Sequence, residues 1–104
     1  MLTEQQQTLR DRGICVIIPT YNNAGTIVDV VSRALHECKD VIVVCDGCTD
    51  NTVTLLRTLD TAPTIIELAK NSGKGNALKA GFRYALDNGF AYAITLDGDG
   101  QHYP

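Results

Sequence analysis

The sequence predicts an α/β fold, in which a parallel β-sheet is covered by helices on both faces. Four short apolar runs alternate along the chain with segments of helical periodicity, which gives the order β-α-β-α-β-α-β. The runs are apolar throughout instead of alternating with polar residues, and this is typical of strands buried on both faces. Short connections between successive elements favour right-handed crossovers, and therefore a Rossmann-like parallel sheet.

Composition limits the classes of function. The 104 residues suffice for one domain or part of one, and the hydrophobic fraction of 44% is typical of a globular protein. The net charge of −3 and the lack of a basic patch argue against a nucleic-acid partner. The polar N-terminus lacks the apolar segment of a signal peptide, and no apolar run has the length of a membrane span. We therefore expect a cytoplasmic location.

Three segments are expected in the first forty residues. Residues 1–12 form a polar arm that is frayed or weakly helical, and residues 13–104 form the domain. Residues 14–18 are an apolar strand that Pro19 closes. Residues 24–39 form a helix, because their apolar side chains recur at helical spacing on one face. That face consists of Ile27, Val30, Val31, Ala34, Leu35 and Cys38.

The rest of the chain continues the alternation. Asp50 is expected to cap a short helix that buries Val53, Leu56 and Leu59. A longer helix opens at residues 73–75, and Asn88-Gly89 ends it. The three remaining strands are expected at residues 41–45, 64–68 and 91–96.

The four cysteines are expected to be reduced and largely buried. Cys15 and Cys45 lie in apolar strand runs, and Cys38 lies on the apolar face of a helix. Cys45 and Cys48 form a Cys-x-x-Cys pair. A redox site of the thioredoxin type would place this pair at a helix start, and a zinc site would need a second pair of ligands at a suitable spacing. Both kinds of site are therefore disfavoured.

The polar residues gather at the carboxyl ends of the predicted strands. In open parallel sheets, ligands bind beyond these ends. Four loops follow the strands, at residues 19–23, 46–50, 71–75 and 97–102, and they contain the polar clusters of the chain. The sequence therefore predicts one site, built from all four loops at one edge of the sheet.

The last of these loops carries closely spaced carboxylates. Asp97 and Asp99 are two residues apart on an extended segment, and Gln101 continues the spacing with a neutral oxygen. Oxygen ligands favour Mg²⁺ or Mn²⁺ over zinc, and such an ion neutralises a diphosphate leaving group. A calcium loop is excluded, because His102 stands where glycine is needed and no closing glutamate follows. A solvated turn rich in aspartate and glycine is the alternative.

The segment Gly73-Lys74-Gly75 suggests phosphate binding. A Walker A loop would need glycine at Leu68, and a dinucleotide fingerprint would need a small residue at Leu78, so neither motif is present. A flexible loop that leads into a helix N-terminus still allows Lys74 to approach a negative charge. A plain glycine-rich start of a helix is the alternative.

Five further residues have two readings each. Asp46 directly follows a strand, where it can accept a hydrogen bond from the imide of a uracil or guanine base, or cap the following turn. Tyr21 can stack on a base or cover the end of the sheet. Asn22 and Asn23 can bind a ribose or satisfy the backbone of their loop, and His102 can contact a phosphate or metal, or be solvated.

The four loops together resemble family 2 of the inverting glycosyltransferases, which have the GT-A fold. The matching residues are Pro19-x-Tyr21-Asn22, Asp46-Gly47-x-Thr49-Asp50, Gly73-Lys74-Gly75 and Asp97-x-Asp99-Gly100-Gln101-His102. The ending of the chain is most similar to the branch that transfers mannose or glucose to polyprenyl or dolichyl phosphate. The resemblance covers about residues 14–104 and implies the nucleotide-binding half of a GT-A fold, with strand order 3-2-1-4.

The resemblance also implies a set of site residues and ligands. Its nucleotide-sugar ligand, a GDP- or UDP-sugar, would contact Pro19, Tyr21, Asn23, Asp46, Lys74, Asp97 and Gly98. Mg²⁺ or Mn²⁺ would be held by Asp99 and Gln101, with Asp97 beside it. Cys45 departs from the family, which commonly has an acidic residue there.

The resemblance implies a metal-dependent sugar transfer, with a polyprenyl phosphate as the acceptor. The acceptor half and the catalytic base of the family lie beyond the metal motif, so we expect the donor-binding part alone, inactive by itself, from a protein associated with a membrane. Alternatives are a non-catalytic nucleotide-binding module, an oligomerising module that pairs through an open sheet edge, and a sugar-phosphate nucleotidyltransferase. The last would need a loop rich in glycine and arginine after the first strand, which residues 19–23 do not provide.

Overall fold

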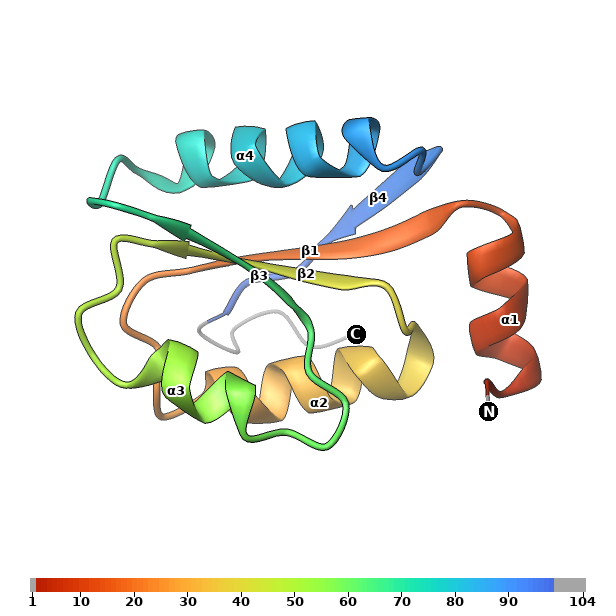
Figure 1. Ribbon diagram of the computed structural model, residues 1–104, viewed down its shortest axis with the longest axis horizontal. Coiled ribbons are helices and arrows are strands. Elements are labelled where there is room, and N and C mark those ends of the chain that lie inside the picture. The colour runs from red at the N-terminus through yellow and green to blue at the C-terminus, as the bar shows by residue number, and fades with distance from the viewer. Residues whose placement is uncertain (1, 99–104) are drawn as a thin grey trace.

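Four parallel strands form a single sheet between two layers of helices in the computed structural model, which describes residues 2–98 (Figure 1). The strands follow the order β3-β2-β1-β4, so the predicted fold class and the predicted strand order 3-2-1-4 are confirmed. Helix α4 covers one face of the sheet, and α2 and α3 cover the other (Figure 1). The elements are α1 (Glu4–Asp11), β1 (Ile14–Thr20), α2 (Ile27–Glu37), β2 (Val41–Asp46), α3 (Thr52–Arg57), β3 (Thr64–Leu68), α4 (Lys74–Asp87) and β4 (Tyr92–Thr95).

The core consists of two apolar layers, one on each face of the two central strands. Val16 and Ile18 of β1 face α2, whereas Cys15 and Ile17 face α4. Both sets are buried, because β1 and β2 lie inside the sheet and are covered from both sides. Helix α4 lies unusually close to β1, since a Cβ atom at Gly81 would stand only 2.5 Å from Cγ2 of Ile17.

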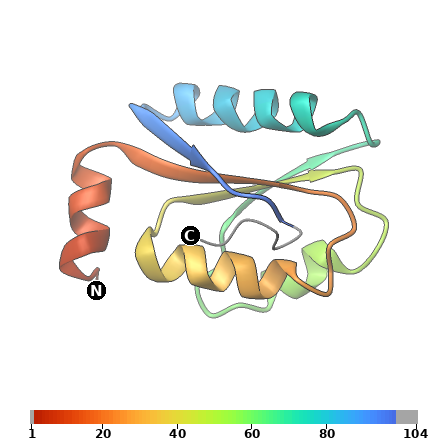
Figure 2. The same ribbon diagram turned by 180° about the vertical axis from the view of Figure 1, so that it is seen from behind.

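The edge strand β4 is more exposed than the sequence predicts. We expect all four strands to be buried on both faces, but the side chains of Tyr92 and Ile94 on β4 are 68% and 50% exposed. The prediction of full burial is therefore wrong for β4. The reason is its place at the edge of the sheet, where no other strand among residues 2–98 pairs with its outer side (Figure 2).

The N-terminal arm is helical, which is one of the two states that its polar sequence predicts, and its helix is firmly capped. Residues Glu4–Asp11 form helix α1, whose N-terminus is closed by a capping box between Thr3 and Gln6. Gln6 is buried, and its Nε2 donates hydrogen bonds to the carbonyl oxygens of Leu35 (3.0 Å) and His36 (2.9 Å). The helix is therefore attached to the end of α2 by a polar side chain, which hydrophobic periodicity does not detect.

The cysteines are free thiols, and Cys15, Cys38 and Cys45 are buried, as predicted. No helix among the described residues has the length and apolar character needed to cross a bilayer.

We expect the buried thiol of Cys15 to make the fold sensitive to alkali. Burial raises the pKa of this thiol from its ordinary value of 9.0 to about 11. The folded state favours the neutral thiol, so its contribution to stability is complete below pH 9 and is lost as the pH rises towards 11. The midpoint of thermal unfolding should therefore fall more steeply across this range in the native sequence than in Cys15→Ala. Equal slopes in the two proteins would contradict this account.

Candidate functional site

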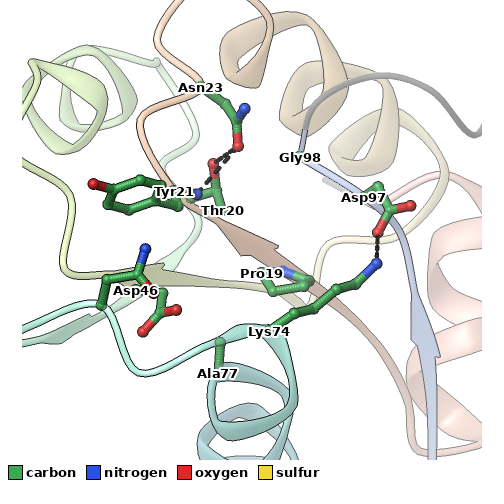
Figure 3. A pocket seen from close by; sticks show the side chains of 10 residues that line it. Pro19, Thr20, Tyr21, Asn23, Asp46, Lys74, Ala77, Asp97 and Gly98 are labelled. Atoms are coloured by element: carbon green, nitrogen blue, oxygen red, sulfur yellow. Dashed lines mark hydrogen bonds and ion pairs between the residues drawn. The ribbon is translucent and has the colours of Figure 1, made fainter.

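The loops that follow the strands enclose a cleft of about 290 Å³ at the carboxyl edge of the sheet (Figure 3). All seven residues expected to bind a nucleotide sugar line this cleft. Its lining consists of Pro19, Thr20, Tyr21, Asn23, Asp46, Asn71, Lys74, Ala77, Asp97 and Gly98. The predicted metal ligands Asp99 and Gln101, and His102, lie outside the described residues.

The first loop is shaped by Asn23. Its Oδ1 accepts hydrogen bonds from Oγ1 of Thr20 (2.6 Å) and from the backbone N–H of Tyr21 (3.1 Å). Of the two readings open to Asn23, the structure therefore shows a loop-stabilising role for this oxygen. The ring of Tyr21 stands at the wall of the cleft and is 47% exposed, so its face is accessible to a planar group.

Asn22 joins the first loop to the second. Its backbone has a φ of 51°, a left-handed conformation that asparagine tolerates better than most residues. The side-chain Oδ1 accepts hydrogen bonds from the N–H groups of Thr49 (2.8 Å) and Asp50 (3.2 Å), and Nδ2 donates to Oγ1 of Thr49 (3.1 Å). Asn22 is not among the residues expected to bind the nucleotide sugar, although the Asn22-Asn23 dipeptide after a strand is a turn signal.

Asp50 provides a second link between these two loops. Its Oδ1 accepts from the N–H (3.1 Å) and the hydroxyl (2.5 Å) of Thr52, and its Oδ2 accepts from the N–H of Ala24 (3.2 Å). These hydrogen bonds, the strongest from the Thr52 side chain, lower the pKa of Asp50. Asp50 acts at the start of α3 as predicted, but it lies one residue before the N-cap, Asn51.

Asp46 anchors the third loop to the end of β2. It is only 4% exposed, and its Oδ1 accepts from the N–H (2.9 Å) and the hydroxyl (3.1 Å) of Ser72. Its Oδ2 accepts from the N–H of Gly73 (2.9 Å). Both oxygens therefore serve the loop that leads into α4. Capping of a turn is the reading that the geometry favours, although the turn lies after β3 and not, as expected, directly before α3.

Gly47 allows the second and third loops to touch. Its φ is +73°, and a Cβ atom there would lie 2.2 Å from the backbone nitrogen of Asn71. Only glycine combines this left-handed conformation with so close an approach of backbone to backbone.

Lys74 and Asp97 form an ion pair across the cleft (Figure 3). Lys74 is the first residue of α4, and Asp97 follows β4. The two residues also line a neighbouring hollow of about 300 Å³, together with Pro19, Leu78, Thr95 and Leu96. The pair therefore stands where the two cavities meet.

Gly98 brings the start of the fourth loop into close contact with the first loop. A Cβ atom at this position would lie 2.9 Å from both Cβ and Oγ1 of Thr20, and the Gly98 carbonyl accepts a hydrogen bond from Oγ1 of Thr26 (2.9 Å). The contact holds the backbone beside Asp97 against the end of β1.

The chemistry of this edge suits a divalent cation and a phosphorylated ligand. Asp97 supplies a carboxylate oxygen, a hard ligand, which already faces the positive charge of Lys74. Residues 2–98 contain no cluster of three histidine, cysteine or acidic side chains that could hold a metal by themselves. The N-terminus of the 14-residue helix α4 opens at Lys74, and such helix ends attract anions.

The Cys-x-x-Cys pair lies beneath the site. Cys45 is fully buried, and burial raises the pKa of its thiol well above the usual range. Sγ of Cys48 is directed at the carbonyl oxygen of Thr20 (3.6 Å). The neutral thiol of Cys45 is a poor nucleophile and a poor metal ligand, which agrees with a packing role for this residue.

Comparisons with known proteins point to one family. The model of the family described as Glycosyl transferase family 2 matches residues 15–104. The chain is 36% identical over 95 residues to a polyprenol monophosphomannose synthase of Mycolicibacterium smegmatis, and the match covers 86% of this chain and 36% of that protein. It is 31% identical over 112 residues to a UDP-N-acetylglucosamine--dolichyl-phosphate N-acetylglucosaminyltransferase of Methanococcus voltae, covering 92% of this chain and 45% of that protein.

A solved structure has the same fold. It is glucosyl-3-phosphoglycerate synthase from Mycobacterium tuberculosis, in complex with Mn²⁺, uridine diphosphate and glucosyl-3-phosphoglycerate. The TM-score is 0.65 at 23% sequence identity, over 91% of this chain and 36% of that one. The chain thus spans less than half the length of each of these three proteins.

Proposed function

The chain belongs to glycosyl transferase family 2, and from this premise we propose that it is the donor-binding part of a metal-dependent glycosyltransferase that uses a nucleotide-diphosphate sugar. The observation that carries the proposal is the cleft at the carboxyl edge, where all seven residues expected from sequence line one cavity. Parallel topology brings the four loops to one edge, and the cavity between them is lined by the residues that the family resemblance assigns to the donor, which supports a common ligand.

The proposed donor lies along the cleft, with its base at the Tyr21 end and its diphosphate at the Lys74 end. Tyr21 offers an accessible ring for stacking on the base. Asp46 shapes this end through Ser72 and Gly73, so its contribution to base binding is chiefly indirect. The N–H groups at the start of α4 and the ammonium of Lys74 favour the diphosphate.

We propose that Asp97, Asp99 and Gln101 hold the divalent cation. The donor set fits a hard cation, because Asp97 supplies a carboxylate oxygen that is paired with a positive charge. When bound, Mg²⁺ or Mn²⁺ neutralises the charge that develops on the leaving diphosphate.

A polyprenyl phosphate is the acceptor that we propose. The names of two similar proteins contain polyprenol and dolichyl phosphate, and this supports a lipid phosphate here. Its phosphate oxygen is already anionic, so the attack on the sugar needs no general base, whereas an alcohol acceptor would need one. Such an acceptor places the full protein at a membrane surface.

Calorimetric titration tests the donor site. We expect the chain to bind UDP or GDP in the presence of Mn²⁺, to bind it much more weakly without metal, and to lose the metal-dependent part in Asp97→Asn. Absence of metal-dependent binding at millimolar nucleotide would contradict the proposal.

The second candidate function is self-association through the apolar edge of β4, which the exposure of Tyr92 and Ile94 favours. A sizing column run on the same sample tests it, because a dimer elutes earlier than a monomer.

A further inference from the structure

The ion pair between Lys74 and Asp97 is unusual in its position. It joins the first residue of α4 to the segment after β4 (Figure 3), and both partners line both cavities. The Lys74 side chain is 62% exposed and reaches the carboxylate from solvent, whereas the Asp97 side chain is 19% exposed. The lysine is therefore the more mobile partner and the aspartate the more fixed one.

Helix stability does not explain a lysine at this position. The N-terminus of a helix carries a partial positive charge, so a cation there is unfavourable, and α4 has no acidic residue in its first turn to offset it. An ion pair with one well-exposed partner also contributes little to folding. A cation at a helix N-terminus does, however, add to the attraction that this helix end has for an anionic ligand.

We propose that Lys74 is an exchangeable counter-charge. In the structure its ammonium pairs with Asp97 and neutralises this carboxylate. When a divalent cation takes its place at Asp97, the lysine turns on its flexible stem to the diphosphate of the donor. This inference rests on the proposed function, and it assigns to one lysine both competition with the metal and attraction of the nucleotide.

The exchange predicts effects of opposite sign. Removing the ammonium should strengthen the binding of Mn²⁺ alone by about three- to tenfold, because a competing positive charge leaves Asp97. The same change should weaken the binding of the nucleoside diphosphate at saturating Mn²⁺ by a similar factor, about three- to tenfold. A lysine that only binds phosphate would leave the affinity for Mn²⁺ alone unchanged, and one that only supports the loop would weaken both.

The experiment compares Lys74→Met with Lys74→Arg and with Lys79→Met. Lys79 is an exposed residue of the same helix and lies outside both cavities. Replacing it by methionine removes one positive charge, as Lys74→Met does, but away from the proposed site. Free Mn²⁺ is measured by electron paramagnetic resonance without nucleotide, and UDP and GDP are titrated at saturating Mn²⁺. We expect opposite shifts in Lys74→Met, values near those of the native chain in Lys74→Arg, and no shift in Lys79→Met.

The outcomes separate this inference from the function on which it rests. Unchanged or weaker Mn²⁺ binding in Lys74→Met overturns the exchange, even if the native chain binds nucleotide normally. Equal shifts in Lys79→Met and Lys74→Met also overturn it, because net charge then accounts for the effect. If the native chain binds no nucleotide with Mn²⁺, the donor site itself is refuted.

Discussion

Replacing Gly47 by alanine is expected to lower the free energy of unfolding by about 3 kcal/mol or more. Two effects add at this position. The residue has a φ of +73°, which an L side chain rarely adopts, and its new Cβ atom would lie 2.2 Å from the nitrogen of Asn71 and 2.5 Å from the carbonyl carbon of Lys70. The obstructing atoms belong to the backbone, so no side chain can rotate away. Urea denaturation measures the loss.

Two other glycines provide matched controls. Gly73 has a φ of +99° and a ψ of 155°, a region that glycine occupies almost exclusively, but a Cβ atom there would meet nothing within 4 Å. Gly73→Ala therefore isolates the conformational strain, at about 1–3 kcal/mol. Gly75 lies in α4 with open space and without a positive φ, so Gly75→Ala should be neutral or stabilising by about 0.5–1 kcal/mol. If Gly47→Ala is no worse than Gly73→Ala, the two loops are not pressed together.

The second large effect is expected for Asp46→Asn. The asparagine keeps the size of the side chain, but its amide N–H₂ must face either the N–H of Gly73 or the N–H and hydroxyl of Ser72. A buried donor that faces another donor loses its hydrogen bond, and we expect a loss of about 2 kcal/mol of stability. Because the displaced loop carries Lys74, the affinity for nucleotide with Mn²⁺ should also fall about tenfold.

The combination of readouts distinguishes the two roles of Asp46. Thermal unfolding and nucleotide titration are measured on the same protein, with Asp60→Asn as the control, because Asp60 is exposed and lies outside the cleft. A loop anchor loses stability and affinity together. A loss of affinity at unchanged stability would instead show that the carboxylate mainly contacts the base.

The order of elements and the meeting of the four loops around one cleft could be predicted from sequence, because both follow from periodicity and from the geometry of parallel strands. Apolar runs located β1 and β2, and the shared direction of the strands placed Tyr21, Asp46, Lys74 and Asp97 at one edge. The strand order came from the family resemblance. These features depend on short-range patterns or on topology, and loop detail does not change them.

The roles of individual side chains could not be predicted, because their partners lie in other loops. Asn22 bonds to Thr49 and Asp50, 27 and 28 residues along the chain, and the turn signal of Asn22-Asn23 does not specify these distant partners. The attachment of α1 through Gln6 also depends on a distant partner, Leu35. In addition, a buried glutamine leaves no mark in the pattern of apolar residues. The exposure of β4 depends on what lies beside the edge, which its own apolar residues do not reveal.

The hydrogen bonds of Asn22, Asp46 and Asp50 have a thermodynamic consequence for ligand recognition. They tie three loops to one another through backbone N–H groups, so the wall of the cleft is ordered before any ligand arrives. Binding to loops that are already ordered costs less conformational entropy than binding that must first order the loops. The remaining entropy cost of ordering protein groups then falls mainly on the exposed side chains of Tyr21 and Lys74, at the two ends of the cleft.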